Sequence, residues 1–276
     1  MNSTIPLAGV LGFPVAHSKS PRLHGHWLAK YGIQGHYVPL HVAPENLTST
    51  LKSMPNMGFV GCNVTIPHKE VALALAQQVT DAARRIGAAN TLVFKDGEIH
   101  ADNTDGIGFI ENLRQNAPNW RADAGPVLVI GAGGAARAIL VALLDAGAPE
   151  ILLTNRTADR ASALAAEFGP PVKAYPWEKT ETLLSQAATL VNTTALGMAG
   201  KEAFPFSLNG LPSTALATDI VYAPLDTPFL QAARAQGCQT VDGLGMLLHQ
   251  AAPGFARWFG RMPEVTDETR RMVLGL

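Results

Sequence analysis

A short apolar run that ends in a cluster of glycines constrains the fold more than any other feature. Residues 127–144 read VLVIGAGGAARAILVALL, and the β-branched start, Val127–Ile130, leads into GAGG and then into an Ala-rich segment. The run is long enough to cross a membrane. However, the glycines near its start and Arg137 within it favour a buried strand, a tight turn and a buried helix. We therefore expect one βα unit here.

The rest of the chain alternates between strand-like and helix-like segments. Strands are expected at Leu7–Phe13, His36–His41, Phe59–Thr65, Thr91–Lys95, Val127–Ile130, Ile151–Asn155, Thr189–Thr194, Ala217–Val221 and Thr240–Asp242. Helices are expected at Pro21–Tyr31, Pro44–Met54, Pro67–Gln77, Gly106–Gln115, Ala135–Ala146, Ala158–Phe168, Thr227–Gln236, Leu244–Phe259 and Thr266–Leu274. This alternation predicts an α/β protein with mostly parallel sheets and helices on both faces. The polar segment Pro118–Pro126 predicts a domain boundary.

Composition and charge exclude several classes of protein. Charged residues make up 16 % of the 276 residues and the net charge is -1, so neither a disordered chain nor a protein that binds nucleic-acid phosphates is expected. Two cysteines cannot form a disulfide framework and are expected to be reduced. The first 16 residues lack Lys and Arg and carry two prolines, unlike a secretory signal. We expect a cytoplasmic protein with no membrane partner.

The glycine cluster has the spacing of a dinucleotide-binding turn. Gly131, Gly133 and Ala136 fit the pattern G-x-G-x-x-G/A, in which the glycines allow a tight turn and a close approach to a pyrophosphate. The following helix start supplies amide groups to the phosphates. Any buried βα turn can carry glycines, but the strand before and the helix after this one favour dinucleotide binding.

The end of the next expected strand indicates which dinucleotide is bound. NAD-binding chains place an acidic residue about 20 residues past the glycines, whereas this chain has Asn155, Arg156 and Thr157, followed by Arg160. A guanidinium binds a 2′-phosphate that a carboxylate would repel. The two arginines could instead form a solvated helix start beside Asp159. The sequence favours NADP.

Polar residues also gather after the strands of the first half. Ser18 and Ser20 could hold a carboxylate or phosphate, or Ser20 could only cap the helix that follows. Asn63 and Thr65 are expected on one side of a strand. We expect Pro67 to begin a helix.

Lys69 would then lie in the first turn of that helix, where its charge opposes the helix dipole. Such a placement suggests a nearby group that needs the charge, although Lys69 could equally be an exposed residue screened by Glu70. His68 is expected at the surface. Asp105 lies at an expected helix start, where an N-cap role alone would explain it. Asn90 is a further polar strand end in the same half.

The motifs together resemble the shikimate dehydrogenase family. The resemblance runs over nearly the whole chain, through SKSPRLH, GCNVTIPHK, GAANTL, DNTDGIGF, GAGGAARA, NRT, NTTALGM, DIVYAPLDTP and DGLGMLLHQ. It implies a two-domain α/β enzyme with a deep cleft between a substrate-binding domain at residues 1–104 and a Rossmann-type NADP-binding domain at 105–245. The helices from about residue 246 to 276 would return to the first domain.

The resemblance also implies an activity and a set of site residues. The activity would be the reversible, NADPH-dependent reduction of 3-dehydroshikimate to shikimate in aromatic amino acid (chorismate) biosynthesis. Lys69 and Asp105 would be the acid–base pair. Substrate would be bound by Ser18, Ser20, Asn63, Thr65 and Asn90, with Tyr222 and Gln250 on the other side of the cleft. The cofactor would contact Gly131, Ala132, Gly133, Gly134, Ala135, Asn155, Arg156, Thr157, Arg160, Thr193, Val221, Gly243 and Met246.

Two other functions remain open from the sequence. One is a quinate/shikimate dehydrogenase with broader cofactor use. The other is a non-catalytic sensor of NADP(H) or a metabolite on the same fold, which should have lost Lys69 or Asp105, yet both are present. No metal is expected, and both a monomer and a homodimer are compatible with the sequence.

Overall fold

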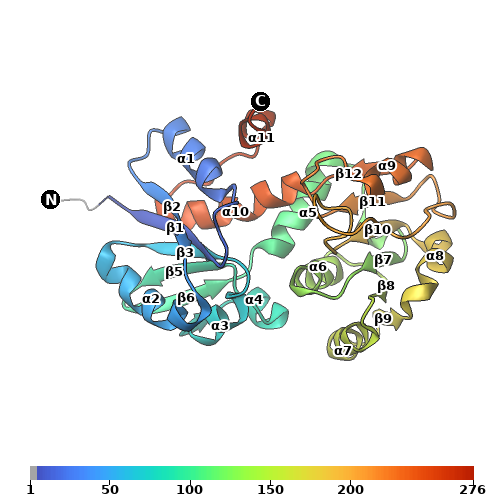
Figure 1. Ribbon diagram of the computed structural model, residues 1–276, viewed down its shortest axis with the longest axis horizontal. Coiled ribbons are helices and arrows are strands. Elements are labelled where there is room, and N and C mark those ends of the chain that lie inside the picture. Colours follow the sequence, from blue (N-terminus) through green and yellow to red (C-terminus); the bar gives the residue numbers. More distant parts are fainter. Residues whose placement is uncertain (1–4) are drawn as a thin grey trace. The chain divides into compact units, whose positions relative to one another are not determined.

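The structure is a computed structural model that describes residues 5–276 and divides into two compact units (Figure 1). Unit 1 comprises Met1–Asp105 and Leu248–Leu276, and unit 2 comprises Gly106–Leu247. The division therefore falls after Asp105 rather than near Pro118–Pro126. The reason is that the helix α5 (Asp105–Asn116) buries its apolar face, including Phe109, in the core of unit 2.

Unit 1 contains a mixed six-stranded sheet. The strand order is β2-β1-β3-β5-β6-β4, with β1 (Leu7–Gly12), β2 (His36–His41), β3 (Gly61–Val64), β4 (Gln78–Val79), β5 (Thr91–Lys95) and β6 (Glu98–Asp102). Strands β1, β2 and β3 are parallel, whereas β5 runs antiparallel to both β3 and β6. Asp96 and Gly97, both with positive φ, form the turn between β5 and β6. Strands β4 and β6 were not expected from the sequence.

Helices from both ends of the chain cover this sheet. They are α1 (Ser20–Lys30), α2 (Leu47–Ser53) after a 3₁₀ turn at Pro44–Asn46, α3 (Lys69–Ala74), α4 (Asp81–Ile86), α10 (Leu244–Phe259) and α11 (Asp267–Leu274). Pro67 does not begin α3, because the helix starts at Lys69. Trp258 of α10 donates a hydrogen bond of 2.9 Å from Nε1 to the carbonyl of Leu92. The C-terminal segment thus completes unit 1.

Unit 2 is a doubly wound α/β unit. Its six strands are all parallel, in the order β12-β11-β10-β7-β8-β9, which is the Rossmann order when read from β9. The strands are β7 (Val127–Ile130), β8 (Ile151–Thr154), β9 (Val172–Tyr175), β10 (Thr189–Asn192), β11 (Leu216–Asp219) and β12 (Gln239–Val241). Besides α5, its helices are α6 (Gly134–Asp145), α7 (Ala158–Phe168), α8 (Thr180–Leu183) and α9 (Pro228–Ala235). Strand β9 and helix α8 of this unit, and α4 of unit 1, were not expected from the sequence.

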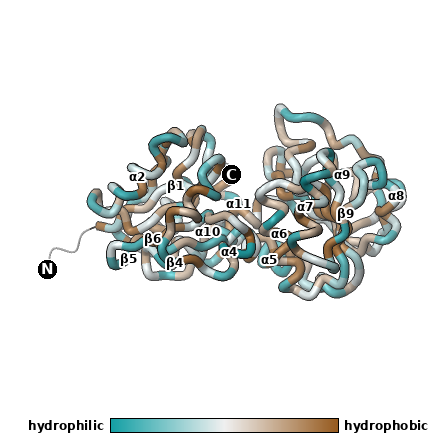
Figure 2. The backbone as a smooth tube through the Cα atoms, turned by 90° about the horizontal axis from the view of Figure 1, so that it is seen from below, coloured by the Kyte–Doolittle hydropathy of each residue, from teal (hydrophilic) through white to brown (hydrophobic). Residues whose placement is uncertain are grey.

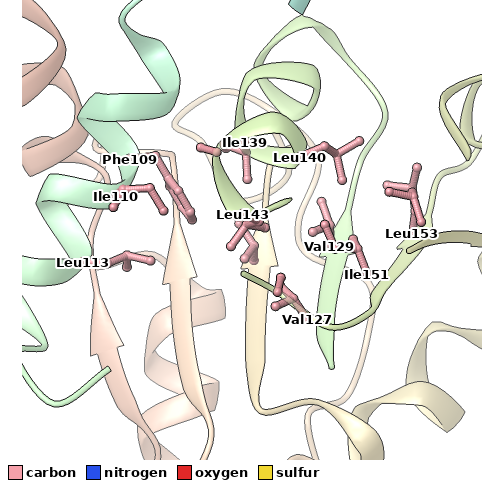
Figure 3. Close-up of a cluster of buried hydrophobic side chains, with 14 of the residues drawn as sticks. Phe109, Ile110, Leu113, Val127, Val129, Ile139, Leu140, Leu143, Ile151 and Leu153 are labelled. Atoms are coloured by element: carbon pink, nitrogen blue, oxygen red, sulfur yellow. The ribbon is translucent and has the colours of Figure 1, made fainter. Parts of the chain in front are cut away.

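Two-sided burial of the unit 2 sheet accounts for the low charge of the chain. All four residues of β7 have no exposed surface, and Figure 3 shows Val127 and Val129 beside Leu143 of α6, in the same cluster as Leu113 of α5. Strands of this kind leave no position for a charged side chain. The mostly parallel α/β fold expected from the sequence is confirmed.

Apolar segments are distributed through both units (Figure 2). In the described part of the chain, no helix has the length and apolar character needed to cross a membrane. The run at 127–144 is divided between β7 and α6, as expected. Cys62 and Cys238 are both free and buried.

Candidate functional site

The glycine turn after β7 is closely packed at Gly131 and open at Gly133 and Gly134. Gly131 has a φ of 111°, and a Cβ added there would lie 2.5 Å from Thr193 Oγ1. The Thr193 hydroxyl donates to the carbonyl of Ile130 at 2.8 Å, which holds β10 against the turn. A Cβ at Gly133 or Gly134 would meet nothing within 4 Å. The start of α6 therefore has space for a phosphate group beside its amides.

Asn155 connects the glycine turn to the end of β8. Its Oδ1 accepts a hydrogen bond of 3.0 Å from the amide of Ala132, and its Nδ2 donates to the carbonyl of Thr157 at 2.8 Å. The resemblance had assigned Asn155 only to cofactor binding. The structure adds a second role, because this side chain fixes the distance between the pyrophosphate turn and the expected 2′-phosphate region.

A pocket of about 520 Å³ lies beyond the end of β8. Asn155, Arg156, Thr157 and Arg160, which the sequence assigned to the 2′-phosphate, all line this pocket. The guanidinium of Arg156 is 2.9 Å from the carboxylate of Glu202, and both side chains are exposed. Neither the glycine motif nor the strand pattern indicated that residues near 202 would reach this pocket.

Asp219, at the end of β11, is a buried carboxylate that holds two loops. It accepts hydrogen bonds from Asn192 Nδ2 (3.1 Å), the amide of Val221 (3.0 Å) and Thr227 Oγ1 (2.7 Å). Burial raises the pKa of Asp219 to about 6, against the effect of these three donors. Asp219 was not among the residues expected from the sequence. Its position at the end of an apolar strand, just before Val221 and Tyr222, could have indicated a role in the site.

The remaining candidates of unit 2 follow β11 and β12: Tyr222 for the substrate, and Val221, Gly243 and Met246 for the cofactor. Val221 is buried beside Asp219, and Tyr222 is partly buried, which raises the pKa of its phenol. A Cβ at Gly243 would lie 2.3 Å from the carbonyl of Ile220, so glycine is required where these loops meet. Met246 packs against the core of unit 2.

Unit 1 brings Lys69 and Asp105 into direct contact. Lys69 Nζ is 2.5 Å from Asp105 Oδ2, and their side chains are 28 % and 13 % exposed. Asn90 Nδ2 donates to the other carboxylate oxygen at 2.7 Å. Asp105 is the first residue of α5 rather than the residue before it, and its two carboxylate oxygens accept hydrogen bonds from Lys69 and Asn90. The Asp105 amide donates to Asn103 Oδ1 at 3.0 Å.

The backbone around α3 determines where Lys69 lies. His68 is buried, contrary to expectation, and its Nε2 is 2.8 Å from the carbonyl of Val42. The carbonyl of Lys69 accepts a hydrogen bond of 2.9 Å from the amide of Ala89. These contacts fix both sides of the first helical residue, so that its ammonium reaches Asp105.

Both the oxygen and the nitrogen of the Asn63 side-chain amide form hydrogen bonds within the protein. Its Oδ1 accepts from the Tyr37 hydroxyl at 2.6 Å, and its Nδ2 donates to the carbonyl of Asn90 (3.1 Å) and to Thr91 Oγ1 (3.2 Å). The Tyr37 hydroxyl also hydrogen-bonds with Ser20. Asn63 therefore orients the strand ends around it, and only the second lone pair of Oδ1 remains for a ligand.

A buried histidine supports Tyr37. The ring of His24 stacks on that of Tyr37 with centroids 3.9 Å apart and an interplanar angle of 2°. Within the described residues, neither ring nitrogen of His24 has a hydrogen-bond partner. Burial lowers the pKa of His24 to about 3, so the ring is neutral. It acts as an apolar platform beneath the Tyr37 phenol.

The other expected substrate residues of unit 1 occupy separate positions. Ser20 is buried and is not the cap of α1, because the capping position belongs to Lys19. Ser18 Oγ accepts a hydrogen bond of 3.3 Å from the Ser20 amide. Thr65 lies just after β3, and its methyl group is the nearest atom, at 2.5 Å, to a Cβ added at Gly12.

Gln250 of α10 lies beside Asn90. Its Oε1 is 3.3 Å from Asn90 Nδ2, and its carbonyl accepts from Thr104 Oγ1 at 2.8 Å. The expectation that Gln250 and Tyr222 lie together opposite the other substrate residues is therefore wrong for Gln250. It belongs to unit 1, because α10 extends from unit 2 into unit 1. Across residues 5–276 there is no cluster of side chains that could hold a metal ion.

Comparisons with known protein families match three parts of the chain. Residues 10–92 match the shikimate dehydrogenase substrate binding domain, residues 114–198 match shikimate / quinate 5-dehydrogenase, and residues 243–267 match the shikimate 5′-dehydrogenase C-terminal domain. The first and third regions fall largely in unit 1, and the second falls in unit 2.

Relatives and solved structures match nearly the full length. A shikimate dehydrogenase (NADP(+)) of Paracoccus denitrificans is 62 % identical, over 98 % of this chain and 96 % of the relative. One from Cereibacter sphaeroides is 60 % identical, over 98 % and 97 %.

The crystal structure of shikimate 5-dehydrogenase from Thermus thermophilus, in complex with NADP(H) and shikimate, is 40 % identical. It has a TM-score of 0.88 and covers 98 % of this chain and 99 % of that one. A quinate dehydrogenase from Corynebacterium glutamicum in complex with NAD is 30 % identical, with a TM-score of 0.90 and coverage of 98 % and 99 %. Sequence motifs, architecture and full-length similarity therefore agree that this chain belongs to the shikimate dehydrogenase family.

Proposed function

We propose that the chain is an NADP-dependent shikimate dehydrogenase in which Lys69 and Asp105 form the acid–base pair. The reaction is the reversible reduction of 3-dehydroshikimate to shikimate, a step of aromatic amino acid biosynthesis. The observation that carries the proposal is the Lys69–Asp105 contact of 2.5 Å beside Asn90. A binding protein without catalysis has no need for a partly buried ammonium that a carboxylate orients.

The residues of unit 2 fit a bound NADP(H). The open side of Gly133 and Gly134 accepts the pyrophosphate, and the pocket beyond β8 offers Arg156 and Arg160 to the 2′-phosphate. No carboxylate stands at the end of β8 where an NAD ribose would need one. When bound, NADPH supplies the hydride that reduces the carbonyl carbon of the substrate.

Lys69 supplies the proton in the reducing direction. The carbonyl oxygen gains negative charge as the carbon is reduced, and an ammonium both stabilises that charge and donates a proton to it. Asp105 fixes the Lys69 ammonium through Oδ2, and Asn90 fixes Asp105 through Oδ1. In the reverse direction neutral Lys69 accepts the proton of the hydroxyl.

Substrate binding is proposed for the polar residues around this pair. Ser18 and Ser20 bind the substrate carboxylate at the start of α1, and Thr65 binds a ring hydroxyl. Asn63 and Asn90 contribute mainly by orienting their neighbours, since most of their hydrogen-bonding capacity is used within the protein. Further contacts are proposed for Gln250, which lies beside Asn90, and for Tyr222 of unit 2.

Replacement of Lys69 tests the acid–base assignment. In Lys69→Ala we expect kcat to fall by roughly 10²–10⁴-fold, with a much smaller change in the KM for shikimate. The measurement is the change in NADPH absorbance with shikimate and NADP⁺. Lys95→Ala, at an exposed lysine of β5, is the matched control. Near-normal turnover of Lys69→Ala would show that Lys69 is not the acid–base group.

Steady-state kinetics with both substrates and both cofactors separate the proposal from its nearest alternative. A quinate/shikimate dehydrogenase would turn over quinate, and broader cofactor use would give comparable kcat/KM with NAD⁺. We expect shikimate with NADP⁺ to be the preferred pair, because Arg156 and Arg160 line the pocket beyond β8. A preference for quinate or for NAD⁺ would favour the alternative.

We also propose that the enzyme works in the cytoplasm, as one chain or as a homodimer. Cys62 and Cys238 are unpaired, as expected for a reducing compartment. All residues proposed for the reaction belong to a single chain.

A further inference from the structure

The pocket beyond β8 contains two charged residues that the proposed cofactor site does not use. Lys201 and Glu202 line it together with Arg156, Arg160 and Trp177. They come from the long segment between β10 and β11, far along the chain from the arginines of α7 and its preceding turn. The pocket thus has charged groups on two walls formed by separate segments.

The wall that carries Lys201 is held in place by backbone hydrogen bonds. The amide of Gly197 donates to the carbonyl of Glu202 at 2.8 Å, and the amide of Lys201 donates to the carbonyl of Met198 at 3.0 Å. The amide of Ala199 donates to the carbonyl of Ala223 at 2.9 Å, which attaches this wall to the loop after β11. Lys201 therefore projects from an ordered turn.

The charges that line the pocket match a phosphate monoester. Arg156, Arg160 and Lys201 are cations, and Glu202 is the single carboxylate of the lining. A fully ionised phosphate monoester carries a charge of about −2. The two arginines alone would supply this charge, but Glu202 pairs with Arg156 at 2.9 Å and offsets one of them. A third cation restores the balance.

We propose that Lys201 is a third cation for the 2′-phosphate of NADP(H), and that Glu202 is a counter-ion that the phosphate displaces from Arg156. The inference rests on the proposed use of NADP and assigns two further residues that determine cofactor specificity. Displacement costs little, because an ion pair between side chains as exposed as these contributes little to stability. Glu202 thereby keeps Arg156 oriented without cofactor and weakens NADP(H) binding only slightly.

The two residues are predicted to change NADP⁺ binding in opposite directions. We expect Lys201→Met to raise the Kd for NADP⁺ roughly three- to fivefold, and Glu202→Gln to lower it roughly two- to threefold. Neither should change the Kd for NAD⁺, which has no 2′-phosphate. Both effects should diminish in high salt, because the groups are exposed.

Calorimetric titration of the full chain with NADP⁺ and NAD⁺, at low and high salt, measures these effects. Lys179→Met and Glu178→Gln are matched controls, since they make the same charge changes at exposed residues of unit 2 that do not line the pocket. Equal effects of Lys201→Met and Lys179→Met would mean that only the overall field of the protein matters. An unchanged Kd for NADP⁺, or an equal change for NAD⁺, would also overturn the role of Lys201. Weaker NADP⁺ binding by Glu202→Gln would overturn the role of Glu202.

Arg156→Gln and Arg160→Gln distinguish failure of this inference from failure of the proposed function. If these variants lose the preference for NADP⁺ while Lys201→Met does not, the cofactor site stands and Lys201 is excluded from it. If the arginine variants also leave the preference unchanged, the 2′-phosphate does not bind in this pocket, and both proposals fail.

Discussion

The buried carboxylate of Asp219 makes stability depend on pH in a direction that can be calculated. Burial raises its pKa from 3.8 to about 6. The folded state therefore binds this proton more tightly than the unfolded state. As the pH rises from about 4 to about 6, the free energy of unfolding falls. A pKa rise of about 2 corresponds to about 3 kcal/mol.

Asp219→Asn removes this pH dependence while keeping the hydrogen bonds that the carboxylate makes. An Asn oxygen still accepts from Asn192 and from the amide of Val221, and its NH₂ group donates to Thr227 Oγ1 in place of accepting from it. We expect the variant to gain up to about 3 kcal/mol relative to the wild type between pH 4 and pH 8. At pH 4 both chains are neutral at this position and should differ least.

Urea unfolding followed by circular dichroism at the two pH values provides the measurement. Comparing the two chains at each pH removes the contribution of all other titrating groups. Asp226→Asn is the control, because the hydrogen bond and ion pair with Arg234 lower the pKa of Asp226 below its ordinary value of 3.8. Asp226 therefore titrates mostly below pH 4, and the difference in stability between Asp226→Asn and the wild type should stay nearly constant from pH 4 to pH 8. If the difference between Asp219→Asn and wild type changes by less than about 0.5 kcal/mol from pH 4 to pH 8, the argument from burial is refuted.

Three further changes test the contacts of unit 1. Tyr37→Phe removes the 2.6 Å hydrogen bond to Asn63 and should raise the KM for shikimate several-fold with little loss of kcat; a fall in kcat alone would contradict this. Asp105→Asn should lower kcat at least tenfold, because Lys69 loses its ion pair; unchanged kcat would leave Asp105 with a structural role only. Gly61→Ala would place a Cβ 2.2 Å from the carbonyl of Leu92 and from Trp258 Nε1, so a lower urea midpoint is expected; an unchanged midpoint would refute the close packing.

Local signals were sufficient to predict the core of unit 2. A β-branched run, a glycine turn and an Ala-rich helix are set by residues adjacent in sequence, and β7 and α6 form as expected. The same adjacency places Asn155, Arg156 and Thr157 at the end of β8. Such predictions succeed because neighbouring parallel strands need a crossover connection, which is usually a helix.

Strand β6 was missed although the sequence contained a signal for it. Residues Glu98–Asp102 read EIHAD, which is too polar to stand out as a buried strand. The preceding Asp96-Gly97 pair is typical of a two-residue hairpin turn, and it forms that turn here. Strand β4 has only two residues, Gln78–Val79, and its pairing with β6 is a tertiary contact that no local pattern indicates.

The candidate site was predicted residue by residue but not in its contacts. Sequence reasoning alone could not distinguish an N-cap role for Asp105 from an ion pair, because the answer depends on Lys69 and Asn90, which lie 36 and 15 residues away in the sequence. Nor could it place Gln250 beside Asn90, since that contact joins segments from the two ends of the chain. Residues such as Tyr37, His24 and Asp219 were missed because they act on other side chains.

The return of α10 and α11 to unit 1 determines which of the two units can be completed first during translation. Residues up to Asp105 leave the ribosome first, but the contacts of Trp258 with Leu92 and of Phe255 with Trp27 form only after the last segment has been translated. Unit 2, which is continuous in sequence, is complete earlier. The half of the protein that is made first is therefore finished last. A stop codon near residue 248 would leave a Rossmann unit attached to an incomplete unit 1 that lacks most of α10 and all of α11.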